Sequence, residues 1–582
     1  RVLFRSEADV LRVFAQIINE GIVYRQLKPV HWSIANQTAL ADAELEYQDR
    51  MDPSIYVKFE AHLNGNCPDA LKSEEPLSFL IWTTTPWTLP ANQAIAVHPR
   101  FNYQVLNTAE HGRILIGEDL IESFTENTGI TGKVEANISG EALAGLEYEH
   151  PFIDARLPLV TAEYVTADAG TGLVHTAPGH GIDDYHSGQK YGLPTYCPVQ
   201  GDGTYDDTVP DWLQGLSIYD ANPEIIKRLK ESGAMLHHSE FSHSYPHDWR
   251  SKTPVIFRST EQWFIAVDKA LNSSQKTLRD MAISSLSDVS FTPDWGENRL
   301  RGMLEARPDW CISRQRSWGL PIPAFRDANG EVLMTRASVN AIADEIAIHG
   351  SSHWFAAEPS TLLSGYSLSE DADAPQAFDI ASAEKMMDIF DVWFESGSSW
   401  AAVLDAQSEN SPADLYLEGS DQHRGWFHLS LLISLAVKQR PPFKQILTHG
   451  FIVDKDGYKL SKSKGNALSV AEVLQKYGAE VTRNWVSNLS YESDIKLDLS
   501  ILDAAGDSYR KIRNTLRFLL SNLNAYTAIA LDDLYAELAK VPQNSIQYWI
   551  LAETDTLYTT VRSAYESFNF KNARSEERRV GK

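Results

Sequence analysis

The spacing of apolar residues changes twice along this chain, and this change constrains the fold more than any other feature of the sequence. Short apolar runs separated by Gly, Pro, Asn and Asp fill residues 50–240, strand-like and helix-like runs alternate up to about residue 500, and helical spacing continues from residue 501. Each kind of region must bury its own apolar face. With 582 residues, the chain is long enough for about four domains.

The first 240 residues contain one predicted helix and several predicted strands. Apolar residues recur at helical spacing over residues 8–23, which predicts an amphipathic helix. Strands are predicted in the β-rich region at residues 78–83, 94–97, 113–117, 157–160 and 172–175. We therefore expect one compact, mostly β domain at about residues 50–240.

The later part of the chain has a different pattern. A helical run at 427–437 precedes a buried-strand pattern at 446–453, and a polar loop then leads to a helix at 469–477. This alternation predicts part of a parallel α/β sheet. In the helical region one face is apolar and another carries Arg510, Arg513 and Arg517, a stripe that is more typical of a solvated face than of a phosphate-binding one. The apolar face consists of Ile512, Leu516, Leu519, Leu520 and Leu523.

Composition excludes several classes of protein. The net charge of −26 opposes nonspecific binding to nucleic acid, although local basic patches remain compatible with a nucleic-acid partner. Cys67, Cys197 and Cys311 form no Cys-x-x-Cys pair, which argues against a disulfide framework and a thiolate zinc site. Because no apolar run approaches about 18 residues, we expect no membrane segment and a cytoplasmic protein.

A lysine-rich loop is the most informative polar segment. Lys455, Lys459, Lys462 and Lys464 fall within ten positions, directly after the predicted strand at 446–453. Ligands of open α/β sheets bind at the carboxyl ends of strands, where clustered ammonium groups can neutralise a triphosphate and stabilise charge during nucleotidyl transfer. From its chemistry alone, such a loop is more often a solvated turn.

Several motifs resemble those of one enzyme family. Residues 459–463 read Lys-Leu-Ser-Lys-Ser and resemble the Lys-Met-Ser-Lys-Ser signature of class I aminoacyl-tRNA synthetases, with Leu460 in place of Met. In this order, segments 82–92, 170–181, 307–316, 391–397 and 416–426 are similar to those of isoleucyl-tRNA synthetases. Thr85 stands where the valyl and leucyl enzymes carry Arg. The resemblance covers essentially all of residues 7–573.

This resemblance implies an α/β protein with three parts. We expect a partial Rossmann-type parallel sheet, a large inserted and mostly β editing domain, and part of a C-terminal α-helical anticodon-binding domain. The implied bounds are 7–49 for a connective part of the catalytic domain, 50–240 for the editing domain, 241–500 for the second half of the catalytic domain and 501–573 for the start of the anticodon-binding domain.

The family's reaction implies substrates and a synthetic site. The family joins L-isoleucine to tRNA(Ile) at the expense of ATP through isoleucyl-adenylate, so the implied partners are tRNA(Ile), L-isoleucine and ATP with Mg²⁺, and the implied state is a monomer. Lys459 and Lys462 would act in catalysis and hold the ATP phosphates, together with Ser461 and Ser463. The implied substrate-binding residues are Glu418, Asp421, Gln422, Trp393 and Trp426.

The resemblance also implies a second, hydrolytic site. One missing methylene is worth only about 1–3 kcal/mol in an apolar pocket, so binding alone rejects valine weakly. The family removes valine from Val-tRNA(Ile) in its inserted domain. There, Asp184 would pair with the α-ammonium group of the substrate and His175 would contact the ribose or the side chain. Hydroxyl groups would come from Thr83, Thr84, Thr85 and Thr88.

No metal site is predicted. His175 and His180 have a metal-like spacing, but no thiolate or Glu-bearing zinc motif accompanies them. The histidines at 237, 238, 243 and 247 are equally unconvincing as a metal cluster. We therefore expect Mg²⁺ only as part of the ATP complex and no zinc site in this chain.

The two ends of the chain resemble translated sequencing adapter. Residues 3–6 can be encoded by CTC TTC CGA TCT, whose reverse complement encodes residues 574–577. We therefore expect 1–6 and 574–582 to be adapter-derived tails of an internal fragment, 7–573. The His-x-Gly-His signature of the family does not occur in this sequence, so we expect impaired synthesis. Two alternatives stay open: a chain that keeps only the editing deacylase activity, and a noncatalytic tRNA-binding paralogue.

Overall fold

The structure is a computed structural model that describes residues 2–63, 67–405, 411–454, 456–458, 460, 469–497, 499–523 and 530–573. The chain divides into two compact units. The first contains Arg1–Met281 and Arg307–Val403, and the second contains Ala282–Ala306 and Leu404–Lys582.

All five strands predicted in the β-rich region are confirmed to within one residue at each end. They are β4 (Leu77–Thr83), β5 (Ala94–Val97), β7 (Gly112–Gly117), β10 (Arg156–Thr161) and β11 (Leu173–Thr176). The predicted helix at 8–23 is α1 (Val2–Asn19), which ends earlier because the chain turns at Gly21, whose φ is +74°. Such a backbone conformation suits glycine, and β1 (Val23–Ser33) begins two residues later.

The strands of the β-rich region join one mixed sheet. Its order is β11-β5-β10-β9-β3-β4-β7-β6-β8, and β12 pairs with β3. Phe59, Phe79, Val97 and Tyr148 belong to a buried core cluster that packs under this sheet. The remaining strands are β3 (Leu45–His62), β6 (Asn102–Thr108), β8 (Gly132–Ser139), β9 (Glu147–Glu149) and β12 (Met235–Asp248), and the longest helix of the region is α5 (Ile218–Glu231).

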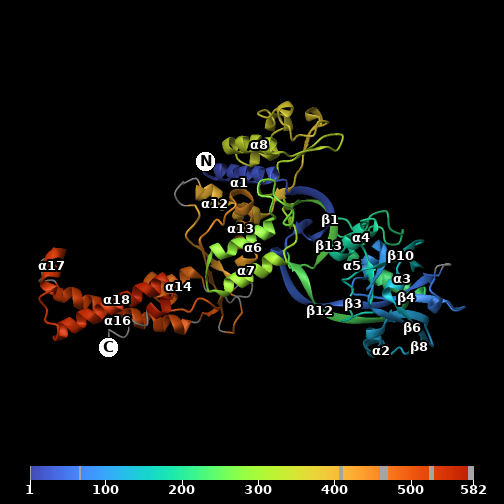
Figure 1. The fold of residues 1–582 in the computed structure, drawn as a ribbon, viewed down its shortest axis with the longest axis horizontal. Helices are drawn as coiled ribbons and strands as arrows, with labels where there is room; N and C mark the ends of the chain where they lie inside the picture. Colours follow the sequence, from blue (N-terminus) through green and yellow to red (C-terminus); the bar gives the residue numbers. More distant parts are fainter. Residues whose placement is uncertain are drawn as a thin grey trace. The chain divides into compact units, whose positions relative to one another are not determined.

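Two long strands, β3 and β12, connect the β-rich region to the rest of the first unit. They pair antiparallel from Leu45 opposite Asp248 to Tyr56 opposite His237. Because the chain leaves through β3 and returns through β12, the residues between them form an insertion (Figure 1). The boundaries proposed at 50 and 240 fall inside these two strands. Next to them, β1 pairs antiparallel with β13 (Val255–Ile265), and β2 (Thr38–Leu40) and β15 (Trp310–Cys311) complete this second sheet.

Asp248, the last residue of β12, gathers hydrogen bonds where the insertion begins. Its Oδ2 accepts bonds from Ser33 Oγ at 2.6 Å, Asn36 Nδ2 at 2.6 Å and Ser251 Oγ at 3.0 Å. Burial alone would raise the pKa of Asp248, but these bonds and one from the Arg250 amide outweigh it and lower the pKa. The carboxylate therefore joins two segments, 33–36 and 248–251, at the end of the β3–β12 pair.

A buried guanidinium group lies near the same end of the β3–β12 pair, beside Glu44. Arg314 Nη2 is 3.0 Å from Glu44 Oε2 and 3.0 Å from Asp391 Oδ2, and the three side chains are at most 2% exposed. Burial alone would lower the pKa of Arg314, but the two carboxylates outweigh it and raise the pKa. Glu44 immediately precedes β3, and Asp391 caps α11 (Val392–Gly397) by accepting a hydrogen bond from the Trp393 amide.

A group of short elements completes the first unit. α8 (Arg336–His349) packs on α1 (Figure 1). α9 (Ser352–Ala356) follows α8 in the chain. Glu7 of α1 accepts hydrogen bonds from the amide and hydroxyl groups of Ser351. The other elements are α2 (Ile121–Thr128), α3 (Gly140–Leu143), α4 (Ile182–Tyr191), α10 (Pro359–Leu362), α12 (Ser399–Val403), β16 (Ser313–Arg314), β17 (Phe325–Arg326), β18 (Val332–Leu333), β19 (Glu384–Lys385) and β20 (Ile389–Phe390).

The second unit contains the predicted parallel strands. β14 (Ser290–Thr292), β22 (Gln445–His449) and β21 (Tyr416–Gly419) pair in parallel in the order β14-β22-β21. The strand predicted at 446–453 is two strands, β22 and β23 (Ile452–Val453), because Gly450 lies against the backbone of Ser493 and β23 pairs instead with β24 (Ile495–Lys496). The helix predicted at 427–437 is confirmed as α13 (Trp426–Lys438).

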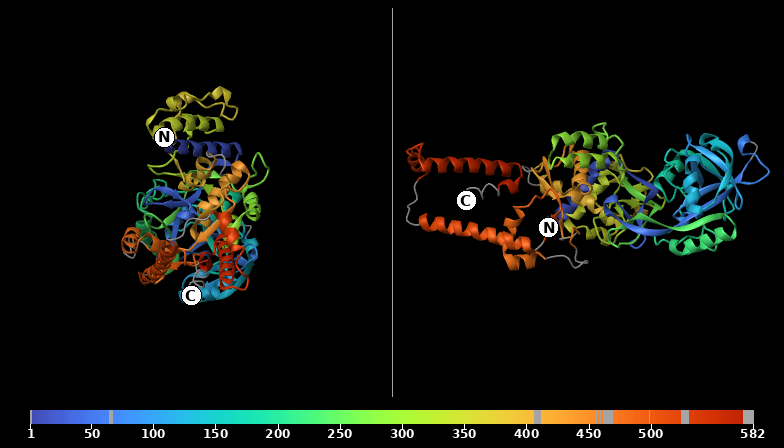
Figure 2. Two further views of the ribbon diagram at one scale, coloured as in Figure 1. Left: turned by 90° about the vertical axis from the view of Figure 1, so that its left-hand side faces the viewer. Right: turned by 90° about the horizontal axis from the view of Figure 1, so that it is seen from below.

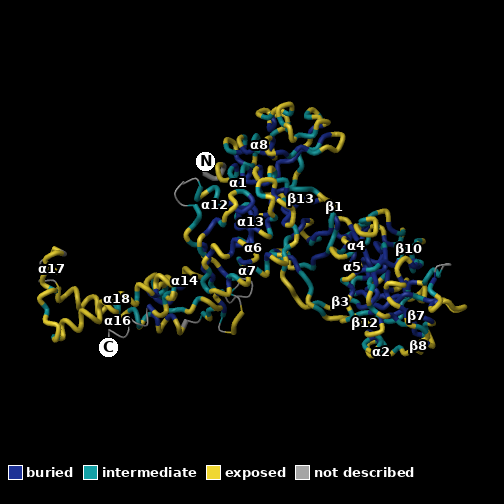
Figure 3. Tube along the Cα trace, in the orientation of Figure 1, coloured by how far each residue is buried: buried dark blue, intermediate teal, exposed yellow. Residues whose placement is uncertain are grey.

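Helices fill the rest of the second unit. α14 (Val470–Tyr477) confirms the helix predicted after the polar loop, and Ser469 caps it. Four of the five apolar residues predicted on one face of α16 (Leu499–Leu523) are exposed, namely Leu516, Leu519, Leu520 and Leu523. Figure 2 shows α16 and α18 (Ile546–Glu566) as two long helices, and Figure 3 colours most of their residues as exposed. The remaining helices are α7 (Trp295–Glu305), α15 (Ala479–Val486) and α17 (Leu531–Leu538), and α6 (Leu278–Ser285) crosses from one unit to the other.

Two expectations from composition can be compared with the structure. The three cysteines are free thiols, as the absence of paired spacing predicts. Among the described residues, no helix is both long and apolar enough to span a lipid bilayer.

Replacing Arg314 with Leu should strongly destabilise the first unit. The change leaves the carboxylates of Glu44 and Asp391 buried without their cation, which costs about 3–5 kcal/mol in comparable sites. Urea denaturation followed by tryptophan fluorescence measures the change. As a matched control, Arg100→Leu removes an exposed ion pair with Glu163 and should cost about 0–1 kcal/mol. Equal effects of the two substitutions would contradict this account.

Candidate functional site

The inserted sheet carries a polar cavity of about 420 Å³. The six residues expected at the editing site all line it, although the sequence spreads them over three separate segments. They are Thr83, Thr84, Thr85, Thr88, His175 and Asp184. The cavity is thus the place where the structure brings these residues together.

The threonines reach the cavity because a strand ends there. β4 stops at Thr83, and Pro86 begins a 3₁₀ helix, Pro86–Ala91, that carries Thr88. Thr83 Oγ1 accepts a hydrogen bond from the Thr85 amide at 3.0 Å and lies 3.2 Å from Thr85 Oγ1. Thr88 donates its hydroxyl proton to the Thr85 carbonyl at 2.9 Å. These short-range bonds hold the hydroxyl groups in a fixed arrangement.

His175 is fixed as a neutral imidazole with its proton on Nε2. Its Nδ1 accepts a hydrogen bond from Asn92 Nδ2 at 2.7 Å, and the amide oxygen of Asn92 accepts one from the Tyr148 hydroxyl. Because the Thr88 hydroxyl already donates to a carbonyl, His175 Nε2 is the donor in their 2.9 Å contact. Burial, followed by His150 and His180 nearby, lowers the pKa of His175 to about 3. His175 therefore stays uncharged at physiological pH.

Asp184 is the acidic group of the cavity. It belongs to the first turn of α4, and its Oδ2 accepts a hydrogen bond from the Ala177 amide at 2.8 Å. The Tyr164 hydroxyl is 3.5 Å from Oδ1. Burial raises the pKa of Asp184 to about 6, although the Ala177 amide opposes this shift. A carboxylate with so few partners in a buried site is suited to receive a cation from a ligand.

Glycines form one wall of the cavity. Gly170 has a φ of +80°, and a Cβ atom there would lie 3.0 Å from the ring of Trp82. Both the backbone conformation and the close approach therefore require glycine at this position. This function of the Gly-rich segment at 170–181 differs from the dinucleotide-binding reading of such segments, which lacks the necessary βαβ pattern here.

Sequence reasoning missed several residues around the cavity. Asn92 sets the tautomer of His175, Tyr148 orients Asn92, and Tyr164 lies beside Asp184. Asn92 is the last residue of the quoted segment 82–92, so its polar side chain next to a run of small and apolar residues was an available signal. Tyr148 and Tyr164 stand in unremarkable strand and turn patterns, and only the fold places them here.

The second unit contains part of the expected synthetic site. Glu418 is the penultimate residue of β21 and His449 is the last residue of the adjacent parallel strand β22. Glu418 Oε2 is 4.0 Å from His449 Nε2. Asp421 and Gln422 lie in the next turn, Ser420–His423, where Gln422 Oε1 accepts a hydrogen bond from the Trp426 amide at 2.9 Å. The Trp426 ring stacks on Tyr416 with centroids 3.9 Å apart. Four predicted residues therefore gather at the carboxyl end of this sheet.

The other predicted synthetic residues are not in this group. Trp393 belongs to the first unit, so its pairing with Trp426 around one side chain stays a prediction. Lys459, Ser461, Lys462 and Ser463 lie outside the described residues. Their predicted contacts with ATP stay predictions as well.

A family model and individual relatives indicate the same protein family. Residues 3–498 match the family model of class I tRNA synthetases (I, L, M and V). The isoleucine–tRNA ligase of Nitratiruptor sp. is 44% identical over 580 residues, which cover 97% of this chain and 60% of that protein. The isoleucine–tRNA ligase of Persephonella marina is 44% identical over 583 residues, covering 98% of this chain and 59% of that protein.

A solved structure was also matched. It is the ternary complex of Agrobacterium radiobacter LeuRS with tRNA and LeuAMS, at 18% identity and a TM-score of 0.45, covering 98% of this chain and 67% of that one. The chain spans about three-fifths of the length of the curated relatives it matches. From the family model, which covers most of its residues, this chain belongs to the class I tRNA synthetase family.

Proposed function

We propose that the protein to which this chain belongs attaches L-isoleucine to tRNA(Ile) through isoleucyl-adenylate, and that its inserted domain hydrolyses misactivated valine and Val-tRNA(Ile). The observation that carries the editing part is the cavity that gathers all six expected residues. The isoleucine part is supported by relatives named isoleucine–tRNA ligase at 43–44% identity.

The polar groups of the cavity could bind the aminoacyl ester at the end of a tRNA. The ionised form of Asp184 would pair with the α-ammonium group of the amino acid, and this pair would replace the solvation that burial removes. The threonine hydroxyls would hold the ribose and the attacking water. His175, a neutral donor held by Asn92, would contact the ribose or the side chain without changing charge during the reaction.

The volume of the cavity sets a limit on what it admits. A volume of about 420 Å³ gives room for an aminoacylated ribose. Isoleucine is larger than valine by one methylene. A rigid wall would exclude isoleucine because this methylene would overlap it, and such overlap discriminates more strongly than the contact energy that one methylene gains in a pocket. The hydrogen-bonded positions of Thr88 and His175 supply that rigidity.

The synthetic reaction would use the second unit. At the carboxyl ends of β21 and β22, Glu418 would receive the ammonium group of isoleucine, and Trp426 would contact its side chain. ATP would bind as its Mg²⁺ complex, with Lys459 and Lys462 on its phosphates. The domain bounds given by the family resemblance, a cytoplasmic location and a monomeric state stay predictions.

Asp184→Asn should abolish deacylation of Val-tRNA(Ile) without destabilising the fold. The amide keeps an oxygen for the Ala177 amide but loses the charge that would bind the ammonium group. Because burial raises the pKa of Asp184, the ionised carboxylate costs stability at neutral pH, and its removal should leave the melting temperature unchanged or higher. A control, Asp183→Asn, changes the exposed neighbour and should retain activity. Equal losses for both variants would contradict the proposal.

The pH dependence of deacylation should follow Asp184. The ionised form is the binding form, so kcat/KM should fall about tenfold per pH unit below about pH 6. His175, with a pKa of about 3, does not titrate between pH 5 and 8. Initial rates measured over this range test the prediction. A profile that stays flat down to pH 5 would show that no group with the predicted pKa of Asp184 controls binding.

The two proposed activities should separate by mutation. In the full-length gene product, Lys462→Ala should depress isoleucine-dependent ATP–pyrophosphate exchange by about 10²-fold or more and leave deacylation intact, since it removes a charge near the phosphates. Thr85→Ala in the same protein should lower deacylation and leave exchange intact. If each variant lowered both activities equally, the division into two sites would be wrong.

A further inference from the structure

A third polar cluster lies outside both proposed sites. Glu345 and His349 are four residues apart on α8, and His353 follows after another four residues on α9. In one straight helix this spacing would place the first and third side chains about 12 Å apart along the axis. Gly350, with a φ of +81° and a ψ of 166°, ends α8 and allows the chain to turn back, so His353 faces Glu345.

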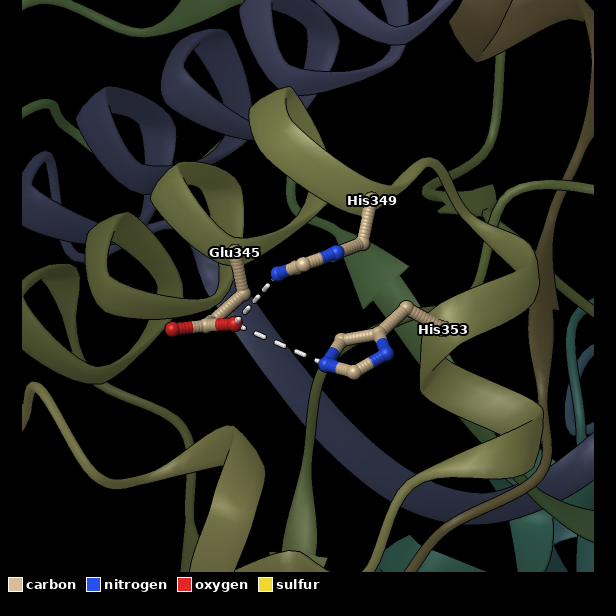
Figure 4. Close-up of side chains that lie close together, drawn as sticks. All are labelled: Glu345, His349 and His353. Carbon is tan, nitrogen blue, oxygen red and sulfur yellow. Dashed lines mark ion pairs between the residues drawn. The ribbon is translucent and has the colours of Figure 1, made fainter.

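The three side chains point toward one another (Figure 4). Glu345 Oε2 is 3.9 Å from His349 Nε2 and 3.5 Å from His353 Nε2. The two imidazole rings have centroids 4.6 Å apart. Ligand atoms around a four-coordinate Zn²⁺ lie about 3.4 Å apart, given metal–ligand distances of about 2.1 Å. A small movement of His349, whose side chain is 50% exposed, would complete this geometry.

One ring nitrogen of the cluster makes no hydrogen bond among the described residues. His353 Nε2 is buried, and within the described part of the chain it has no hydrogen-bond partner. A buried polar nitrogen without a partner is costly, and a metal ion would satisfy it. Over the same described residues, no other group of three His, Cys, Asp or Glu side chains has its ligand atoms within 4.8 Å of one another.

Nearby charges leave the cluster available to a cation. Lys385, the basic residue packed against α9, directs its ammonium group to the carbonyl oxygens of Trp354 and Ala357. Arg12 of α1 is paired with Asp344, the acidic neighbour of Glu345. The carboxylate of Glu7 is bonded to Ser351, at the start of α9. Glu345 therefore faces two imidazole rings, and none of these neighbouring Lys and Arg side chains pairs with it.

We propose that Glu345, His349 and His353 bind one Zn²⁺ ion with a water molecule as the fourth ligand, and that this ion fastens α9 to the end of α8. Two imidazoles and one carboxylate suit Zn²⁺ and disfavour Mg²⁺, which prefers oxygen ligands. The sequence predicts no zinc site when only thiolate motifs and the other histidines are considered. The sequence pattern that indicates this site is Glu-x-x-x-His-x-x-x-His, in which Gly350 follows the first histidine.

Zinc binding to the full 582-residue chain tests the proposal directly. After treatment with a chelator and dialysis, isothermal titration with ZnCl₂ should show one site, and a large excess of MgCl₂ should not compete. His349→Ala and Glu345→Gln should each weaken binding at least about tenfold. Far-UV circular dichroism checks that both variants fold, which the half-exposed position of His349 favours.

A matched control is the His62 and Glu149 pair, an exposed His–carboxylate contact at 3.7 Å that belongs to no three-ligand cluster among the described residues. His62→Ala should bind zinc as the unmodified chain does. Zinc should also slow hydrogen exchange of the α9 amides, an effect that His349→Ala removes. Binding that survives both cluster substitutions, binding that Mg²⁺ competes away, or no binding at micromolar zinc would overturn the proposal.

Discussion

The buried charge of Arg314 joins three parts of the first unit that are far apart in sequence. Its guanidinium group contacts Glu44, at the start of the outgoing strand β3, and Asp391, which caps the helix carrying Trp393. It also donates hydrogen bonds to the carbonyl oxygens of Cys311 and Ser313. Such a group is costly to bury and is tolerated only when all its partners are in place. The same contacts therefore fix where the insertion leaves the rest of the unit.

The polar groups of the cavity in the insertion are also held in place by their hydrogen-bond partners. Its hydroxyl and imidazole groups are bonded to one another, so their directions are set before a ligand arrives. Preorganised groups of this kind need no rearrangement when charge or a new ligand appears. Asp184 is the exception, because a single backbone amide at 2.8 Å and a distant hydroxyl leave part of its charge unsatisfied. The arrangement favours a ligand that brings a positive charge.

Local patterns predicted the short strands of the β-rich region well and the long strands poorly. The five short strands were predictable because each is an apolar run bounded by turn residues. β12 was not, because its central residues are exposed and contain histidine, serine and glutamate without a regular alternation. Its stability comes from pairing with β3, a contact between residues nearly 200 positions apart that no local window contains.

In the candidate site, too, some residues were predictable from the sequence and others only from the fold. Family motifs named Thr83, Thr88, His175 and Asp184, and the fold places them around one cavity. Asn92 and Tyr164 were missed because their contribution depends on which side chains they meet after folding. The cluster at Glu345 was missed for a related reason: its spacing gains meaning only when Gly350 turns the chain back.

The central claim is that the threonine-lined cavity receives the aminoacylated end of a tRNA. A crystal structure of this chain with a nonhydrolysable valyl-adenosine amide tests it most directly. The account predicts that the α-ammonium nitrogen lies about 3 Å from a carboxylate oxygen of Asp184 and that the ribose contacts the threonine hydroxyls. Binding of the analogue elsewhere, with the cavity unchanged, would contradict it.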